Sequence, residues 1–443
     1  MDRRELIVGG ASLAAAVALA PRVVAARSPD AGPNGLRALA RQAWMYGLPL
    51  IEMASARNRA LAAAPANTLL HQRELQTPAT QTITAPNNDT LYSRAVLDLS
   101  RGPVALDLPA IGSRYQSVAL MDMFTNNFAV LGSRTTGPQG GSFVIAGPTG
   151  AAPKGAIRSP GPWVFLLGRT VVNGPSDLDS AHRAQDGLKL AGPSGAAPTA
   201  VAPVARMAAW RDFFGSVGAL LRETPPPATD RAFFYRAAAL GLTPDGFTPP
   251  DFTPAQEAQI SAGVADAVAS SVRPRSGTYQ AGGWSYPRAN LGDFGQDYEF
   301  RAQIALTGLG ALPLAEAVYT RSIGEKGSEF FNGGRYRLHF DADKLPPVDA
   351  FWSLTAYKAM AEGQFLFAPN AIDRYSIGDR TPGLRYGPDG SLDLWISRTD
   401  PGGPRTANWL PAPDGAFILS LRAYLPRPSL LTGEYRFPAL IPV

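Results

Sequence analysis

The sequence predicts a mainly β protein with α segments, an α+β class, and three observations support this. Gly and Pro account for 45 and 41 of the 443 residues, more than average usage, and they separate short apolar runs. Residues 80–172 and 317–443 alternate apolar and polar side chains as half-buried strands do. Residues 201–310 instead repeat apolar side chains at helical spacing.

The chain is too long for one ordinary hydrophobic core, so we expect more than one domain. The pattern predicts a sandwich-like N-terminal β-domain over residues 27–200 and a helical intermediate region over 201–310. A jelly-roll-like C-terminal β-domain is expected over 311–443.

In the N-terminal part, residues 36–46 have helical spacing, and Gly47-Leu48-Pro49 is expected to end that helix. Strands are expected at 91–99, 115–124, 128–131, 142–146 and 163–172. The stretch 115–124 is apolar on both faces, which indicates a central strand. We expect it to be the antiparallel neighbour of 91–99.

Further along the chain, helices are expected at 201–222, 231–240, 254–272 and 296–309. Strands are expected at 335–341, 350–357, 391–396 and 416–424. This order of helices before strands separates the two β-domains along the chain.

The amino terminus resembles an export signal over residues 1–26. A charged start containing Arg3 and Arg4 precedes an apolar stretch of about 15 residues and the small residues Val24-Ala25-Ala26. That stretch is short for a membrane span, which needs about 20 residues, so no span is expected in the mature protein. The paired arginines favour the twin-arginine route, and an ordinary secretory signal is the alternative. A periplasmic or secreted bacterial location follows.

Composition excludes several classes of function. The formal net charge is +5 and no run of Lys or Arg reaches five residues, which disfavours a nucleic-acid partner. The chain has no cysteine and three histidines, none in a ligand-like spacing, so no transition-metal site and no cofactor are expected. A calcium site built from Asp and Asn oxygens is left open.

Two polar clusters precede or follow the first strands. Asp89 and Asp122 are the candidate catalytic acids, because two carboxyl groups with separated pKa values can perform acid/base work. Asn88, Tyr92, Asn126 and Arg134 are candidate substrate-binding residues beside them. The alternative is structural, since Asp and Asn at strand ends bind backbone groups in turns, and Arg134 can form a buried ion pair with Asp89 or Asp122. We expect these residues to share one recess.

Aromatic residues suggest a stacking surface for sugars, yet most of them lie inside predicted strands. Trp352 and Trp395 are therefore expected in the core. Trp409 lies in a Pro-flanked segment that is expected to be a loop, so it is added to the candidate substrate-binding residues.

These segments resemble a bacterial two-domain family of unknown function, with domain of unknown function 1254 followed by domain of unknown function 1214. The resemblance runs from about residue 40 to the end, and its motifs are as follows: Asn88-x-Thr90-Leu91-Tyr92-Ser93, Asp122, Thr125-Asn126-x-Phe128, Gly132-x-Arg134-Thr135-Thr136-Gly137, Phe351-Trp352-Ser353-Leu354-Thr355-x-Tyr357, Arg374-Tyr375-Ser376-Ile377-Gly378-Asp379, Asp389-Gly390-Ser391-Leu392, Asn408-Trp409-Leu410-Pro411-Ala412-Pro413 and Arg422-x-Tyr424. It implies a sandwich-like and a jelly-roll-like domain and a homo-oligomer. It implies no general activity and no catalytic residues.

The functional expectation is an exported envelope enzyme of the hydrolase or lyase class that acts on a polar glycan-like or small organic substrate. It rests on the acid and amide cluster together with the compartment. The rival expectation is a non-catalytic ligand-binding or envelope-assembly protein.

Overall fold

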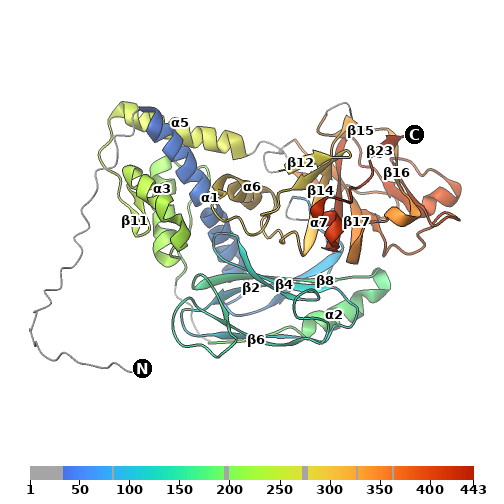
Figure 1. Ribbon diagram of the computed structural model, residues 1–443, viewed down its shortest axis with the longest axis horizontal. Helices are drawn as coiled ribbons and strands as arrows, with labels where there is room; N and C mark the ends of the chain where they lie inside the picture. Colours follow the sequence, from blue (N-terminus) through green and yellow to red (C-terminus); the bar gives the residue numbers. More distant parts are fainter. Residues whose placement is uncertain (1–32, 82–83, 194–198, 272–277, 326–327, 362–363) are drawn as a thin grey trace, which may run out of the picture.

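A computed structural model describes residues 33–81, 84–193, 199–271, 278–325, 328–361 and 364–443. Two β regions and a group of helices make up the molecule (Figure 1), which confirms the mainly β, α+β class. The predicted export signal lies outside the described residues. Within the described ranges, no helix combines the length and the apolar character that crossing a bilayer requires.

The first helix, α1, is longer than the sequence suggests. It spans Pro33–Ala63 and continues through Pro49, so the expected end at Gly47-Leu48-Pro49 is wrong. Proline costs a helix interior about 3 kcal/mol, but α1 is surrounded by other helices and buries many apolar side chains against them. A side chain at Gly47 would meet Val217 of a neighbouring helix at 2.5 Å, so glycine there allows the close approach.

The N-terminal β region is a sandwich of two sheets. One has the strand order β1-β2-β8-β4-β5 and the other β7-β6-β3-β9. Apolar side chains of both sheets, including Leu97, Leu106 and Ile145, form the core between them. The strands are β1 (Leu70–His71), β2 (Thr90–Asp98), β3 (Val104–Leu108), β4 (Gln116–Met121), β5 (Asn127–Gly132), β6 (Gly141–Ala146), β7 (Ile157–Arg158), β8 (Trp163–Val171) and β9 (Lys189–Ala191).

The pairing of β2 with β4 was predicted wrongly. Strand β8 lies between them and is antiparallel to both, so β2 and β4 run in the same direction. The chain from β2 to β4 passes through β3 of the other sheet, which the sequence did not indicate. Every residue of β4 is nevertheless buried on both faces, as expected from its apolar character.

The helices after the sandwich pack beside α1, with α3 and α5 at one end of the molecule (Figure 1). Residues 201–209, expected to be helical, form turns or irregular backbone, because Pro203 and small residues interrupt the periodicity there. The helices and short strands of this part are α3 (Trp210–Glu223), α4 (Arg231–Ala237), α5 (Pro254–Ser271), α6 (Tyr298–Thr307), β10 (Leu242–Thr243) and β11 (Gly246–Phe247), with 3-10 turns η2 (Ala228–Asp230) and η3 (Ala238–Leu240). The turn η1 (Pro175–Asp177) and α2 (Leu178–Asp186) lie instead beside β8 of the sandwich.

The C-terminal β region also has two facing sheets. Inward side chains such as Leu338, Leu354, Leu394 and Leu421 form its core. The larger sheet has the order β12-β13-β14-β22-β17-β18, with β15 on β22 and β19 on β17, and the smaller has β21-β20-β16-β23. The elements are β12 (Thr278–Ala281), β13 (Trp284–Pro287), β14 (Ala317–Ser322), β15 (Phe331–Asn332), β16 (Arg335–Phe340), β17 (Val348–Ala359), β18 (Phe365–Leu366), β19 (Ser376–Gly378), β20 (Leu392–Ser397), β21 (Trp409–Pro411), β22 (Ala416–Pro426), α7 (Pro428–Thr432), β23 (Leu440–Pro442), η5 (Ala342–Lys344) and η6 (Gly403–Asn408).

The two β regions meet along a shared surface that we call the seam. One apolar cluster joins Tyr115, Ala119 and Val171 of the first region to Phe351 and Tyr424 of the second. The rings of Phe351 and Tyr424 stack with centroids 4.2 Å apart. The outer face of the first sandwich is therefore covered, and the loop that leads into β2 is positioned against the second β region.

Candidate functional site

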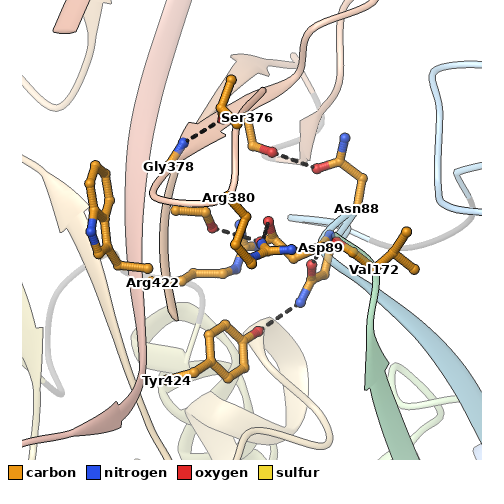
Figure 2. Close-up of polar contacts among 12 residues, drawn as sticks. Asn88, Asp89, Val172, Ser376, Gly378, Arg380, Arg422 and Tyr424 are labelled. Atoms are coloured by element: carbon orange, nitrogen blue, oxygen red, sulfur yellow. Dashed lines mark hydrogen bonds and ion pairs between the residues drawn. The ribbon is translucent and has the colours of Figure 1, made fainter. Parts of the chain in front are cut away.

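Asp89 lies at the seam, immediately before β2, and its carboxylate binds residues of the C-terminal β region (Figure 2). Arg380 donates a 2.7 Å hydrogen bond to Asp89 Oδ1, and the Ser353 hydroxyl donates at 2.6 Å to Oδ2. The carboxylate is 4% exposed. Such a buried charge needs this compensation, because an isolated carboxylate in an apolar environment is very costly.

The two asparagines before Asp89 continue the same contact. The Asn87 side chain accepts from the Asp89 backbone N–H and donates to the Tyr424 hydroxyl at 2.7 Å. The Asn88 side chain accepts a hydrogen bond from the Ser376 hydroxyl at 3.1 Å. The Asn-Asn-Asp sequence therefore joins β2 to three strands of the second region, β17, β19 and β22.

Asp379 is the second acid of the seam, and sequence reasoning did not select it. Its carboxyl group lies 4.0 Å from Arg380, and the Trp352 backbone N–H donates to it at 3.3 Å. Its side chain is 28% exposed. Burial, helped by the nearby Asp89 charge and opposed by Arg380, raises the pKa of Asp379 to about 6. The seam thus holds two acids of different environment on either side of one guanidinium group.

Arg422 holds the loop before Asn87 from within the second β region. It is buried and donates to the Thr355 hydroxyl at 2.8 Å and to the backbone oxygen of Ala85 at 3.2 Å. The Tyr357 hydroxyl donates to the backbone oxygen of Pro86 in the same loop. These contacts fix the loop without using a second carboxylate.

Asp122 belongs to a different environment. It directly follows β4 and accepts from the backbone N–H groups of Phe124 and Asn126, both at 2.9 Å, and from the Asn126 side chain at 3.1 Å. Burial raises the pKa of Asp122 above its usual range, although Asn126 stabilises its charge. Thr125 within this turn has a φ of 70°, which a β-branched residue seldom adopts.

A buried arginine lies near the Asp122 turn. Arg301 contacts the rings of Tyr46, Phe124 and Tyr298 at 5.1–5.3 Å and interacts electrostatically with Asp122. It is 1% exposed. Asp122 and Arg301 do not belong to the seam, because the Asp122 turn lies at the other end of the sheet.

The expected shared recess for Asp89 and Asp122 is therefore wrong. Asp89 precedes the β2 residue that pairs with Val171, whereas Asp122 follows the β4 residue that pairs with Phe165. The two acids lie about eight positions apart along β8, roughly 25 Å at the usual strand rise. Their separation follows directly from β8 lying between two strands that run the same way.

The other candidate residues are divided between these places. Asn88 lies at the seam and Asn126 at the Asp122 turn. Tyr92 lies on β2 beside Arg169, whose guanidinium carbon is 5.5 Å from the tyrosine ring centroid. Arg134 pairs with the buried Glu316 at 2.6 Å, so it neutralises an acid other than the two we expected.

Trp409 is not a loop residue. It begins β21, is 5% exposed, and donates its indole N–H to the Ser397 backbone oxygen at 2.8 Å. The prediction of an accessible stacking platform is wrong, because its ring faces the core despite the prolines nearby. Trp352 is buried in β17, as expected.

A serine and a histidine also come together on the first sheet. His71 Nδ1 lies 2.8 Å from the Ser93 hydroxyl, across the β1–β2 pair. Ser93 is fully buried and also accepts a hydrogen bond from Gln185. A nucleophile needs access to its substrate, so this contact is a structural one.

Two hollows of the surface lie away from the seam. One of about 520 Å³ lies between α1 and α6 and is lined by Arg41, Gln42 and Glu299, among others. Another, of about 500 Å³, lies in the C-terminal β region beside Tyr336. Across the ranges that the structure describes, no cluster of three or more His, Asp or Glu side chains is arranged to hold a metal ion.

Comparison with known proteins agrees with this organisation. Residues 66–192 match the family described as Protein of unknown function (DUF1254), and residues 316–428 match Protein of unknown function (DUF1214). Together these segments cover more than half of the chain and correspond to the two β regions. No curated protein matches the sequence.

Two solved structures are similar to the chain. The VPA0106 protein from Vibrio parahaemolyticus has a TM-score of 0.69 at 26% identity, covering 92% of this chain and 100% of the other. An uncharacterized protein from Burkholderia cenocepacia has a TM-score of 0.44 at 17% identity, covering 90% and 87%. The two family matches, at residues 66–192 and 316–428, show that the chain belongs to the two-domain family of unknown function in which DUF1254 is followed by DUF1214.

Proposed function

We propose that this chain is an exported envelope enzyme that hydrolyses or eliminates a polar, glycan-like or small organic substrate at the seam. One observation carries the proposal. The partly exposed carboxyl group of Asp379 has a pKa raised to about 6, beside the Asp89 carboxylate and Arg380. Accessible acids with perturbed pKa values mark functional sites more often than chance.

Asp379 is suited to general acid/base catalysis at neutral pH. An acid whose pKa is about 6 donates a proton to a leaving group and takes one back without a large energetic penalty in either direction. Asp89 has a positioning role here, because it holds Arg380 and through it the side of the seam that carries Asp379. Asp122 takes no part, since it lies at the opposite end of the sheet.

A second candidate is a non-catalytic ligand-binding or envelope-assembly protein. Both oxygens of Asp89 bind side chains of the protein itself, and these bonds join the two β regions. Carboxylates held in this way are typical of structural networks as well as of active sites. The geometry of Asp89 alone therefore fits a rigid joint, and Asp379 is what favours the enzyme.

The test compares wild type with Asp379→Asn on a panel of glycosides, esters and hydroxy acids. We expect turnover in wild type with an apparent pKa near 6 in its pH–rate profile, and its loss in the variant without loss of the fold. Asp349→Asn is the matched control, because Asp349 is exposed and pairs with Arg427 away from the acid pair. Equal turnover in Asp379→Asn would reject the catalytic role. Ligand binding without turnover on the panel would support the second candidate.

Export is tested separately. Replacing Arg3 and Arg4 with lysine keeps the positive charges but removes the paired arginines that the twin-arginine route requires. We expect the precursor to accumulate in the cytoplasm. Normal export of this variant, measured by fractionation, would point to an ordinary secretory signal instead.

A further inference from the structure

Two buried arginines at the seam lack a carboxylate partner. Arg169 and Arg422 are each 5% exposed. Among the residues that the structure describes, no carboxylate lies within ion-pair distance of either one. Buried charges are normally paired, because the cost of removing an isolated ion from water is high. The Asp89 charge acts on Arg422 from a longer distance, whereas the main charge interactions of Arg169 are with tyrosines. Arg169 is therefore the cation that still calls for an anion.

Arg422 is provided with neutral acceptors, as described above, but Arg169 is not. Its Nη2 donates to the Gly310 backbone oxygen at 2.7 Å, whereas its buried Nη1 has no hydrogen-bond partner within the described part of the chain. A buried donor left unpaired costs about 1–3 kcal/mol, and more when it is charged. This N–H group could donate a hydrogen bond to an oxygen atom of a bound ligand.

Tyrosine side chains surround this guanidinium group. Burial opposes the charge of Arg169, while its interactions with Tyr319, Tyr92, Tyr424 and Tyr115 leave its pKa raised. The Tyr92 ring on β2 faces Arg169, and Tyr319 on β14 interacts with it electrostatically. Both tyrosines keep part of their surface accessible. Within the described ranges, the Tyr92 hydroxyl has no hydrogen-bond partner. The seam therefore combines a cationic donor with a hydroxyl group and two aromatic faces.

The charges of the seam leave room for one monoanion. Among the residues that the structure describes, the seam has the guanidinium groups of Arg134, Arg169, Arg380 and Arg422 and the carboxyl groups of Asp89, Glu316 and Asp379. The nearby Arg114 and Asp177 pair with each other and cancel. Four cations against three acids leave one positive charge once Asp379 is ionised. A phosphate dianion would exceed this charge, whereas a carboxylate matches it.

We infer that Arg169, Tyr92 and Tyr319 form a site for a small organic carboxylate, whose body packs against the tyrosine rings. The inference rests on the proposed function in one respect, because it names the class of ligand that the seam takes. Asn87 links the acid pair to this site, because it bonds both Asp89 and the Tyr424 hydroxyl, and the Tyr424 ring contacts the Tyr319 ring. A substrate carboxylate held at Arg169 would be anchored in the same seam as the acids.

The experiment measures binding of benzoate, acetate and inorganic phosphate to the full mature chain by calorimetry and thermal shift, at constant ionic strength with chloride as the background anion. We expect benzoate to bind and to raise Tm, since a ligand that prefers the native state stabilises it. Arg169→Gln should weaken this binding roughly ten- to hundredfold, which corresponds to one charged hydrogen bond. Arg211→Gln is the control, because Arg211 pairs with Glu257 on exposed helices.

Tyr92→Phe keeps the test valid if Arg169→Gln fails to fold, because it preserves the ring and removes only the hydroxyl. We expect it to weaken benzoate binding several-fold. The inference is overturned if no carboxylate binds, if chloride or phosphate produces the same effect, or if the Tyr92 and Arg169 variants bind as wild type does. Failure here is distinct from failure of the proposed function, which depends on turnover in Asp379→Asn.

Discussion

Asp89 and Asp122 are both buried acids in polar, Asn-containing clusters, yet they have opposite surroundings. Asp89 binds Arg380 and Ser353, which are more than 260 positions away in the chain. Asp122 binds backbone and side-chain groups no more than four positions away. The first acid joins two β regions, and the second closes a local turn.

Two sequence clusters of similar composition therefore have different structural roles, because the fold places different partner residues beside each of them. A guanidinium partner offsets the negative charge of a buried carboxylate, and the carboxylate holds that guanidinium group in position. A carboxylate with local N–H donors is satisfied as an acceptor but stays costly to ionise, which is why burial raises the pKa of Asp122. Only the first arrangement places a second acid, Asp379, nearby.

The largest expected effect comes from removing the seam carboxylate. Asp89→Asn leaves Arg380 without its partner in a mostly buried position and should destabilise the protein by about 3 kcal/mol. Urea unfolding measures the change. The double variant with Arg380→Gln should lose less than the sum of the two single losses. A loss below about 1 kcal/mol in Asp89→Asn would mean that the ion pair does not hold the seam.

A medium effect is expected in the pH dependence of stability. The folded pKa of Asp379 is raised to about 6 from the ordinary 3.8, so the folded state binds the proton more tightly. The resulting stability is fully present below pH 3.8 and is lost as pH rises toward 6. The difference in unfolding free energy between wild type and Asp379→Asn should decline across this range, because groups such as Asp122 titrate equally in both proteins. This decline should be on the order of 1–2 kcal/mol, allowing for partial exposure. Parallel curves would contradict the raised pKa.

The smallest effect is expected at the turn. In Asp122→Asn, the new side-chain oxygen still accepts from the Phe124 and Asn126 backbone N–H groups. The loss of the acceptor for the Asn126 side chain and of the charge near Arg301 is offset by removal of a buried charge. We expect a change in the free energy of unfolding of at most about 1 kcal/mol at neutral pH. A loss as large as that of Asp89→Asn would erase the contrast between the two acids.

Much of the fold was predictable, because it depends on local periodicity. The alternation in β2, β16 and β20 and the helical spacing in α5 and α6 are visible in the chain, and the structure places these elements within a few residues of their expected bounds. The predicted end of the first helix at Pro49 failed because the tertiary packing of α1 outweighs the local cost of proline. The prediction for Trp409 failed because the nearby prolines are typical of a loop, whereas the residue begins a strand and its ring is buried.

The candidate site was predictable only in part. Asn88 and Asp89 were selected, but their partners Arg380, Ser353 and Ser376 lie far along the chain, and no spacing rule connects them. Asp379 lies within the motif that ends Ile377-Gly378-Asp379, which marked family membership without indicating a role. The pairing of Asp89 with Asp122 failed because strand order within a sheet is a property of the whole topology.

The most direct test of the seam as an acid/base site is a pH titration of Asp379 followed by NMR in protein carrying ¹³C-labelled aspartate carboxyl groups, with Asp379→Asn identifying its signal. We predict a midpoint near 6, and a lower midpoint in Asp89→Asn, where the neighbouring negative charge is gone and Arg380 is left to pair with Asp379. A wild-type midpoint close to the ordinary 3.8, unaffected by Asp89→Asn, would contradict the account.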